Sequence, residues 1–483
     1  MKENIRFNVQ QTGEETLTSL QLEQVARILR HRSADSVVRG SVYAPHVFSN
    51  SKAFLESIGV NVRAGFVMPW NTFFSVIVGK YPAMTQLIID SPDFAQLIID
   101  SPDFAAILIE NAQDIKENGM VGGIAPEALG SNPAVKVFGN AAAIDIILAM
   151  SDTVVIDESH QCYAILDRAN HALFKDGTPW SGSYGNSFRH TPRIYYKASL
   201  DSGGFWQYEY SFKQEAGMNH YFEENFVGTY LAGFVNNALV SRPGVATRNN
   251  TTMSQFWQYA QNVGSNYGLY DYHDWRKFVM MSYAKLKNRD AQTVVGFGLS
   301  NAGQNYYTAT TGRTLSIGDG SGESQYDSTY KQVRVLGLEA PYGQMWQFAP
   351  GIRFSGSGAI ATVYDGNIVS NNASGRTFSK PNNYSQAYIT KMQLGEYFDL
   401  IPIAAGSGSA NTYYCDATWA ATGGELLRVG AASNNGSAGG LAAATSYNGF
   451  SISAACDGAR LAFKGDIAKY RLVSGDEMSR LNG

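Results

Sequence analysis

The segment Tyr272-His273-Asp274-Trp275 places an imidazole beside a carboxylate, a combination that general acid–base catalysis often uses. The same histidine belongs to a helical pattern that contains Trp275 and Phe278, and a hydrogen-bonded histidine within a core fits that pattern better than a catalytic one. We therefore interpret His273 as structural. No Ser-His-Asp set, HExxH motif or carboxylate pair has a usable context, so the sequence predicts no catalytic residues and no cofactor.

The glycine-rich segment Gly318–Asp327 is a second candidate for chemistry. Asp319, Glu323 and Asp327 supply carboxylates, and Ca²⁺ prefers such hard oxygen ligands. Their spacing departs from that of an EF-hand loop. We favour an exposed turn over a calcium site, and the sequence predicts no metal site.

The three cysteines, Cys162, Cys415 and Cys456, form neither a CxxC metal knuckle nor a disulfide framework. A disulfide between Cys415 and Cys456 would need the fold to bring them together. We favour buried free thiols in a protein made in a reducing cytosol.

Composition limits the partners of this chain of 483 residues. It is 44% apolar and 16% charged, against roughly 25% charged residues in ordinary soluble domains. Glycine and tyrosine fill much of the difference, which favours a fold rich in strands and loops. A net charge of −4 gives no electrostatic reason to expect nucleic acid or an anionic membrane as a partner. No apolar run is long enough to span a membrane, and the start lacks the apolar core of a signal peptide.

A duplicated segment is the clearest local signal: QLIIDSPDFA occurs at Gln86–Ala95 and again at Gln96–Ala105. Partial copies at Val76–Thr85 and Ala106–Ile115 keep the same phase. Pro82, Pro92 and Pro102 recur every ten residues and exclude one continuous helix through the region.

Each unit has the features of a short helix. Ser91 is a good N-cap, Pro92 suits the first helical position and Asp93 complements the helix dipole. A helix of about two turns is too short to be stable alone. The units are therefore expected to stack on one another or on other chains, forming an oligomeric stalk.

Other elements follow from hydrophobic period and turn residues. We expect helices at Leu20–Arg32, Thr251–Val263 (capped by Thr252 or Ser254) and Asp271–Asn288, a loop at Glu117–Gly130, strands at Arg193–Ala198 and Phe205–Phe212, and a hairpin at Val363–Val369.

Three segments of the second half resemble a known group of folds. Gly337–Phe354 (GLEAPYGQMWQFAPGIRF), Gly423–Ala444 and Ala455–Phe463 are similar, in this order, to the core strands of C-type-lectin-type folds. The similar branch contains the formylglycine-generating enzyme and the ligand-binding variable proteins of phages and diversity-generating retroelements. The resemblance covers roughly residues 165 to 466, and in it Trp346 matches the buried tryptophan of the group.

This chain also departs from the pattern. Gln344 and Gln347 replace signature residues, and the segment Arg428–Ser433 (RVGAAS) lacks a tryptophan. The closely spaced cysteine pair of the oxidase branch and the calcium motifs of animal lectins are absent. The resemblance therefore implies the fold, and neither oxidase chemistry nor calcium-dependent sugar binding.

The resemblance also implies where a ligand would bind. Its ligand-facing surface corresponds to Asn411–Trp419, Ser433–Gly440 and Ser446–Phe450. These segments combine stiff aromatic rings with adaptable Ser, Asn and Gly, as antibody paratopes do. Ordinary polar loops are the alternative. The predicted ligand-binding residues are Tyr413, Tyr414, Trp419, Ser433, Asn434, Asn435, Tyr447, Asn448 and Phe450.

Together these features predict an α+β protein with a stalk of short helical repeats followed by a C-type-lectin-like domain. We assign residues 1–74 to virion attachment, 75–155 to the stalk, 156–466 to the lectin-like domain and 467–483 to a tail. Repeats of this kind resemble those of phage head and tail fibres.

The predicted function is that of a non-enzymatic phage virion fibre or decoration protein, located in the virion and assembled in the host cytoplasm. It would be a homo-oligomer, expected to be a trimer, that contacts other virion proteins and binds a host-surface glycan or protein. A purely structural capsid or tail component and a formylglycine-generating-type oxidase are the alternatives.

Overall fold

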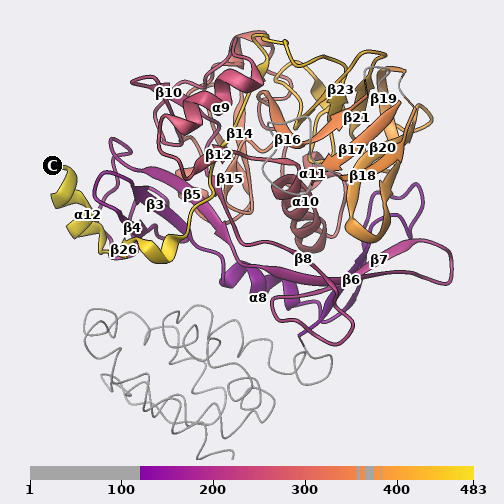
Figure 1. Cartoon of the computed structure of the whole chain (residues 1–483), viewed down its shortest axis with the longest axis horizontal. Coiled ribbons are helices and arrows are strands. Elements are labelled where there is room, and N and C mark those ends of the chain that lie inside the picture. The colour runs from indigo at the N-terminus through magenta and orange to yellow at the C-terminus, as the bar shows by residue number, and fades with distance from the viewer. Residues whose placement is uncertain (1–119, 356–358, 365–374, 382) are drawn as a thin grey trace, which may run out of the picture. The chain divides into compact units, whose positions relative to one another are not determined.

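Helix α10 (Tyr272–Leu286) is the central element of a computed structural model that describes residues 120–355, 359–364, 375–381 and 383–483. Asp271 caps this helix, accepting hydrogen bonds from the backbone amides of His273 and Asp274. Most of its side chains are buried, because β-sheets cover it on more than one side (Figure 1). Residues Val121–Gly483 form one compact unit.

The largest sheet has nine strands and packs on α10 through Ile352, Val363 and Leu427. Eight strands follow the order β18-β17-β16-β22-β23-β21-β19-β20, and β24 pairs with β16. The strands are β16 (Trp346–Phe354), β17 (Ile360–Tyr364), β18 (Gly375–Ser379), β19 (Tyr384–Leu394), β20 (Asp399–Ala405), β21 (Ala417–Ala420), β22 (Leu426–Val429), β23 (Ala444–Ser446) and β24 (Asp457–Gly458). Strands from all three segments of the resemblance therefore meet here, since β16 pairs with both β22 and β24.

A five-stranded sheet with the order β2-β1-β7-β6-β8 contributes to the same core through Tyr196, Tyr208 and Tyr210. Helix α8 (Ala143–Ala149) packs against β7 and α10. The strands are β1 (Gly122–Ala125), β2 (Lys136–Gly139), β6 (Ile194–Leu200), β7 (Trp206–Ser211) and β8 (His220–Phe222).

A seven-stranded sheet with the order β12-β25-β9-β5-β3-β4-β26 joins distant parts of the chain. Its strands are β3 (Thr153–Asp157), β4 (Cys162–Ile165), β5 (Asn186–Thr191), β9 (Asn225–Gly228), β12 (Tyr267–Leu269), β25 (Leu461–Phe463) and β26 (Arg471–Leu472). Helix α9 (Met253–Gln261) packs on β12, and α12 (Gly475–Asn482) packs on β4.

The remaining elements are short. They are the hairpin β10 (Gly233–Val235) with β11 (Ala238–Val240), the three-stranded sheet β13 (Gly322–Gln325), β14 (Lys331–Val335) and β15 (Leu338–Glu339), helix α11 (Ala291–Val294), and the 3-10 turns η1 (Gln304–Tyr306), η2 (Leu315–Ile317), η3 (Gly395–Tyr397), η4 (Gly436–Ala438) and η5 (Ile467–Lys469).

The predicted fold class, α+β with a helical repeat stalk, is wrong for the described residues. They are mostly β-sheet, and only 17% of residues 120–483 are helical. The perfect repeats and the predicted helix at Leu20–Arg32 lie outside the described residues. Within residues 120–155, which we assigned to the stalk, the chain forms β1, β2, α8 and the start of β3.

The strand β1 explains why local pattern failed in this region. We expected a loop at Glu117–Gly130 because of its glycines, yet β1 is fully buried between β2 and β7. A Cβ added at Gly123 would lie 2.2 Å from the ring of Phe138, so the glycine permits close packing inside a sheet. Residues 122–125 become a strand because they pair with β2 and β7. The residues of one short segment do not show which distant strands it will pair with.

Candidate functional site

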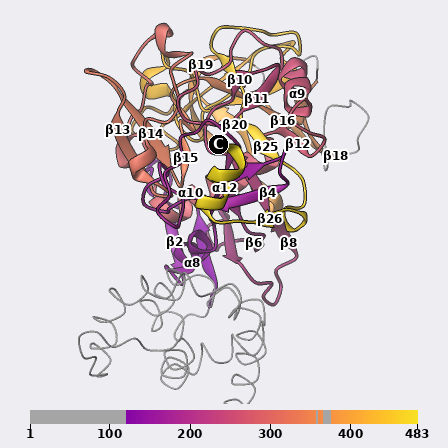
Figure 2. The same cartoon turned by 90° about the vertical axis from the view of Figure 1, so that its left-hand side faces the viewer.

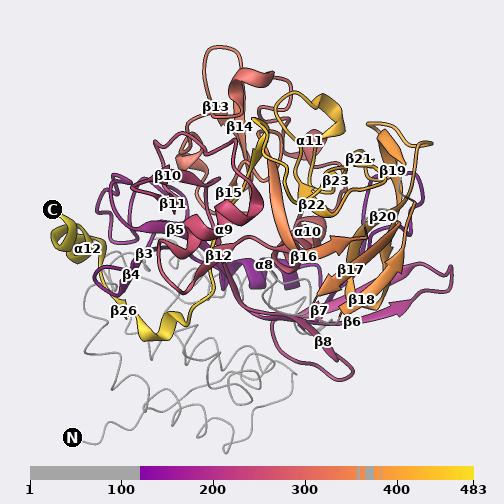
Figure 3. The same ribbon diagram turned by 45° about the horizontal axis from the view of Figure 1, so that its top comes forward.

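The site is built on three neighbouring strands, β22, β23 and β21 (Figures 1 and 3). Arg428 on β22 pairs with Thr445 on β23, and Thr445 pairs with Trp419 on β21. Directly paired residues point to the same face of a sheet. Arg428, Thr445 and Trp419 therefore form a row on one face.

Trp419 lies against an aromatic cluster on this face. Its ring meets that of Trp346 edge to face, with centroids 5.1 Å apart and an interplanar angle of 83°. Tyr307 and Trp346 are buried in the same cluster, whereas Trp419 and Cys456 are only half-buried. The indole of Trp419 is thus held rigidly while part of it reaches the solvent.

Polar and aromatic residues follow the ends of strands β22 and β23. Tyr447 directly follows β23 and is 51% exposed, and Asn434, in the loop after β22, is exposed as well. Asn448 is half-buried, and its side-chain oxygen accepts a hydrogen bond from Arg428. We call Trp419, Asn434, Tyr447 and Asn448 the Trp419 surface.

Phe450 lies beyond the Trp419 surface, beside a surface ion pair. The guanidinium of Arg353 is 5.2 Å from the centroid of the Phe450 ring. The same arginine reaches Glu425 at 3.3 Å, and both side chains are 30% exposed. Phe450 is half-buried, so part of its ring is accessible to solvent. The ring and the Arg353–Glu425 ion pair lie next to each other.

Four other predicted ligand-binding residues serve mainly the interior. Tyr414 is fully buried, donates a hydrogen bond of 2.8 Å to Glu127 and lies under the guanidinium of Arg289. Tyr413 is half-buried and packs on the core around α10. The structure therefore separates both tyrosines from the row of Trp419.

Ser433 and Asn435 fix the loop after β22. Ser433 is buried, and its hydroxyl donates a hydrogen bond of 2.6 Å to the carbonyl of Gly303. The side-chain oxygen of Asn435 accepts one of 2.7 Å from the amide of Ala432. Both residues hold Asn434 in place.

Arg428, the first residue of the row Arg428–Thr445–Trp419, forms a buried ion pair. Arg428 contacts Asp457, and both side chains are almost fully buried. Burial raises the pKa of the Asp457 carboxyl, although Arg428 opposes the shift. One carboxylate oxygen of Asp457 and the Nε of Arg428 have no hydrogen-bond partner among the described residues. The pair fixes Arg428, which in turn orients Asn448.

Sequence reasoning missed a second group of aromatic residues near the Trp419 surface. Tyr306 follows Gln304 and Asn305 in η1 and directly precedes the buried Tyr307. The rings of Tyr326 and Tyr330 approach Tyr306 edge to face. The local mixture of Tyr, Asn and Gln matches that of the predicted binding segments, and this composition was the signal that would have identified them.

The residues first considered for chemistry have structural roles. His273 contacts the carbonyl of Tyr364 at 2.6 Å through Nε2 and Arg276 at 2.8 Å through Nδ1. Asp274 accepts hydrogen bonds from Asn225 and Lys464. The two neighbours thus have separate partners and form no acid–base pair.

The acidic residues of the segment Gly318–Asp327 are also engaged separately. Asp319 accepts from Arg189 at 2.6 Å and contacts His171 at 2.9 Å. Glu323 accepts from the amide of Gly298, and Asp327 accepts from the hydroxyl of Tyr306. In residues 120–483, apart from the three undescribed gaps, no three His, Cys, Asp or Glu side chains gather as metal ligands.

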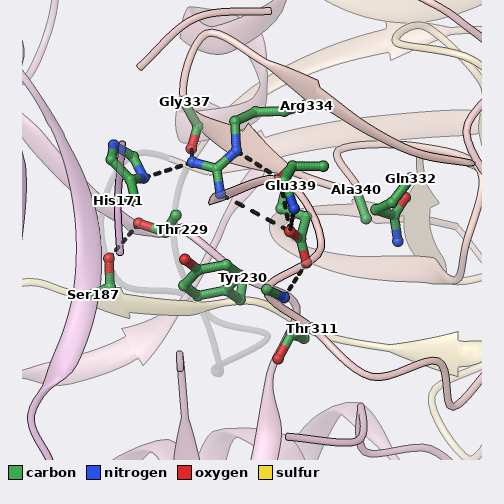
Figure 4. A network of polar contacts seen from close by, with 12 residues as sticks. His171, Ser187, Thr229, Tyr230, Thr311, Gln332, Arg334, Gly337, Glu339 and Ala340 are labelled. Atoms are coloured by element: carbon green, nitrogen blue, oxygen red, sulfur yellow. Dashed lines mark hydrogen bonds and ion pairs between the residues drawn. The ribbon is translucent and has the colours of Figure 1, made fainter. Parts of the chain in front are cut away.

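Arg334 on β14 forms the polar centre behind this segment. Its guanidinium donates to the carbonyls of Gly318 and Gly337 and contacts His171 at 2.6 Å. Glu339 lies on its other side at 3.9 Å (Figure 4). Arg334 and His171 are fully buried, so this network joins β14 to the loops around it and offers nothing to a ligand in solution.

The turn Asp157-Glu158-Ser159-His160 brings a serine, a histidine and an aspartate together. Asp157 lies 2.7 Å from Nδ1 of His160, and the hydroxyl of Ser159 lies 3.1 Å from the same nitrogen. A catalytic triad places its acid and its serine on opposite ring nitrogens. This cluster therefore caps a turn and does not activate the serine.

The cysteines offer no activated nucleophile. All three are free, and Cys162 and Cys415 are buried. Burial raises the pKa of the half-buried Cys456 thiol, and Asp457 beside it acts in the same direction. A thiol of this kind is mostly protonated at neutral pH.

The comparisons with known proteins add no family. No protein-family model matches the chain, and no curated protein is similar enough to count as a relative. In the part of the chain that the structure describes, no helix is both long and apolar enough to cross a bilayer. The function therefore has to be argued from the surface itself.

Proposed function

We propose that this chain is a bacteriophage virion fibre or decoration protein that binds a host-surface glycan or protein through the Trp419 surface. The observation that carries the proposal is the row Arg428–Thr445–Trp419, in which a partly exposed indole packs on Trp346 and belongs to strands whose ends lead to the exposed Asn434 and Tyr447. Aromatic rings combined with Asn side chains suit binding in which stiff contacts are supplemented by adaptable hydrogen bonds.

Two features of the sequence support a virion location. The segments that form β16, β22 and β24 resemble variable proteins of phages, and β16 pairs with both β22 and β24. The duplicated Gln86–Ala105 segment resembles repeats of phage fibres.

We further propose that the protein is a homotrimer that attaches to other virion proteins through its N-terminal region. Several copies of a modest site would gain avidity by high effective concentration.

A binding experiment with host cells tests the proposal. The purified, fluorescently labelled full chain should adsorb to host cells, and Trp419→Ala combined with Tyr447→Ala should lower adsorption roughly tenfold or more. Tyr221→Ala is the matched control, because Tyr221 on β8 is also 51% exposed but lies in another sheet. Unchanged adsorption of the double variant would favour a purely structural virion component.

A further inference from the structure

The cluster of Tyr306, Tyr326 and Tyr330 is a second partly exposed aromatic group with defined geometry. The Tyr306 ring lies 5.7 Å from Tyr326 and 5.1 Å from Tyr330, with interplanar angles of 71° and 70°. Tyr326 and Tyr330 flank the turn between β13 and β14, a hairpin visible in Figure 2. All three residues are half-buried, so part of each tyrosine remains accessible to solvent.

Hydrogen bonds fix the cluster before any ligand arrives. The hydroxyl of Tyr306 donates to Asp327 at 2.6 Å, and the hydroxyl of Tyr326 accepts from the amide of Thr310 at 2.9 Å. Asp327 also accepts from the amides of Thr329 at 2.8 Å and Tyr330 at 2.9 Å. Because the rings are already ordered, the protein would lose less side-chain conformational entropy when a ligand binds to them.

The cluster is tied to the Trp419 surface in two ways. Tyr307, the next residue after Tyr306, is buried in the same aromatic cluster as Trp346, against which Trp419 packs. The amide of Gly303 donates to the carbonyl of Ser433 at 2.8 Å, so the loop that carries Tyr306 is bonded to the loop that carries Asn434. The two aromatic groups therefore belong to one continuous, rigid part of the molecule.

The polar groups around the tyrosines indicate the ligand class. The Arg313 guanidinium lies 5.1 Å from the Tyr326 ring, and the Asp327 carboxylate balances its charge. A locally neutral site with ring faces, hydroxyls and one acceptor suits a ligand with both C–H faces and hydroxyl groups. A neutral saccharide has both, whereas an anionic ligand would meet Asp327.

We infer that Tyr306, Tyr326 and Tyr330 form a second saccharide subsite, occupied by the far end of a neutral oligosaccharide whose near end lies on the Trp419 surface. This inference rests on the proposed receptor-binding function and narrows its ligand to a glycan chain. A short saccharide would occupy the Trp419 surface alone, and a longer one would reach both groups. Affinity should therefore increase with chain length.

Calorimetric titration of the full chain with neutral oligosaccharides, from disaccharide to hexasaccharide, tests this inference. Hits on an array of bacterial-surface glycans would supply the series. Tyr330→Ala should leave disaccharide affinity unchanged and weaken hexasaccharide binding roughly threefold to tenfold. Trp419→Ala should weaken binding of both. Tyr195→Ala is the matched control, since Tyr195 is half-buried and meets Tyr221 edge to face at 6.1 Å in another sheet.

A further variant guards against a misfolded hairpin. Tyr330→Phe keeps the ring and should bind hexasaccharide more tightly than Tyr330→Ala does, and circular dichroism melts should show that all variants remain folded. If Trp419→Ala weakens binding while Tyr330→Ala does not, or if affinity is the same for every length, the second subsite is overturned and the proposed function stands.

A protein receptor would also distinguish the proposed receptor-binding function from the saccharide subsite. If no oligosaccharide binds, yet Trp419→Ala reduces adsorption to host cells, the surface takes a protein receptor and the saccharide inference is wrong. If adsorption is unaffected as well, the proposed function is lost with it.

Discussion

Trp346 and Trp419 contact each other edge to face, but only Trp346 is buried, with 7% of its surface exposed. If the proposed function holds, Trp346 contributes mainly to stability, and Trp419 beside it contributes mainly to binding. Trp346→Ala should destabilise the protein by about 3–5 kcal/mol, because it leaves a cavity beside Tyr307. Trp419→Ala should cost less than half of that and reduce receptor binding. Urea denaturation of both variants measures the difference, and equal losses of stability would contradict the assignment of Trp419 to the surface.

Lys277 predicts a pH dependence of stability. Its ammonium group is buried and lies within 3.1 Å of the carbonyls of Thr191, Pro192 and Glu223 and the side-chain oxygen of Asn225. Burial lowers the pKa of Lys277 from 10.5 to about 7. Between these values the unfolded chain binds more protons than the folded one, so this group makes stability rise with pH.

Melting temperatures of the parent and Lys277→Met between pH 7 and 9 check this expectation. The parent should gain stability across the range relative to the variant. Parallel curves would show that Lys277 titrates alike in both states.

Removing the charge of Asp319 should lower the free energy of unfolding strongly. Burial alone would raise its pKa, but Arg189 and His171 outweigh burial and hold the pKa of Asp319 well below its usual range. Asp319→Asn leaves Arg189, whose side chain is only 4% exposed, without a charged partner. We expect a loss of about 3–5 kcal/mol in the free energy of unfolding. Asp327→Asn, in the same segment but only half-buried, is the control and should cost less.

Thr252 is the N-cap of α9, and it forms a capping box with Gln255. Thr252→Ala should destabilise the protein by about 1 kcal/mol. Ser254→Ala, two residues further along, should have a much smaller effect because Ser254 does not cap the helix. Thermal denaturation compares the two, and a larger effect of the serine variant would reverse the assignment.

Sedimentation of the purified full chain tests the proposed trimer. At micromolar concentration the mass should be about three times 52.6 kDa. A monomer under these conditions would remove the multivalent part of the proposal.

Hydrophobic periodicity and capping residues were sufficient to predict several helices and strands, because these signals lie within the segment that forms each element. The helix expected at Asp271–Asn288 is confirmed as α10, with Asp271 as its cap, and α9 lies within the segment Thr251–Val263. The aromatic strands expected near Arg193 and Phe205 are confirmed as β6 and β7. The hairpin expected at Val363–Val369 extends beyond the described residues, which end there at Tyr364.

Long-range pairing set the limit of sequence reasoning. The burial of Tyr414 depends on Glu127 and Arg289, which come from distant segments, so its composition alone could not distinguish it from the exposed Tyr447. Tyr306 was missed for the same reason, because its partners Tyr326 and Tyr330 belong to a different turn. The pattern identified residue types that suit a binding surface, and the fold decided which of them reach the solvent.

The order of strands in the seven-stranded sheet has a consequence for synthesis of the protein. Strand β3 begins at Thr153, yet β25 and β26, in the same sheet, come from residues Leu461–Leu472. During translation, β9 and β4 have open edges until these last strands emerge from the ribosome. Pairing across such separations slows folding and leaves the nascent chain prone to aggregation. A chaperone that shields those edges would therefore raise the yield of native protein.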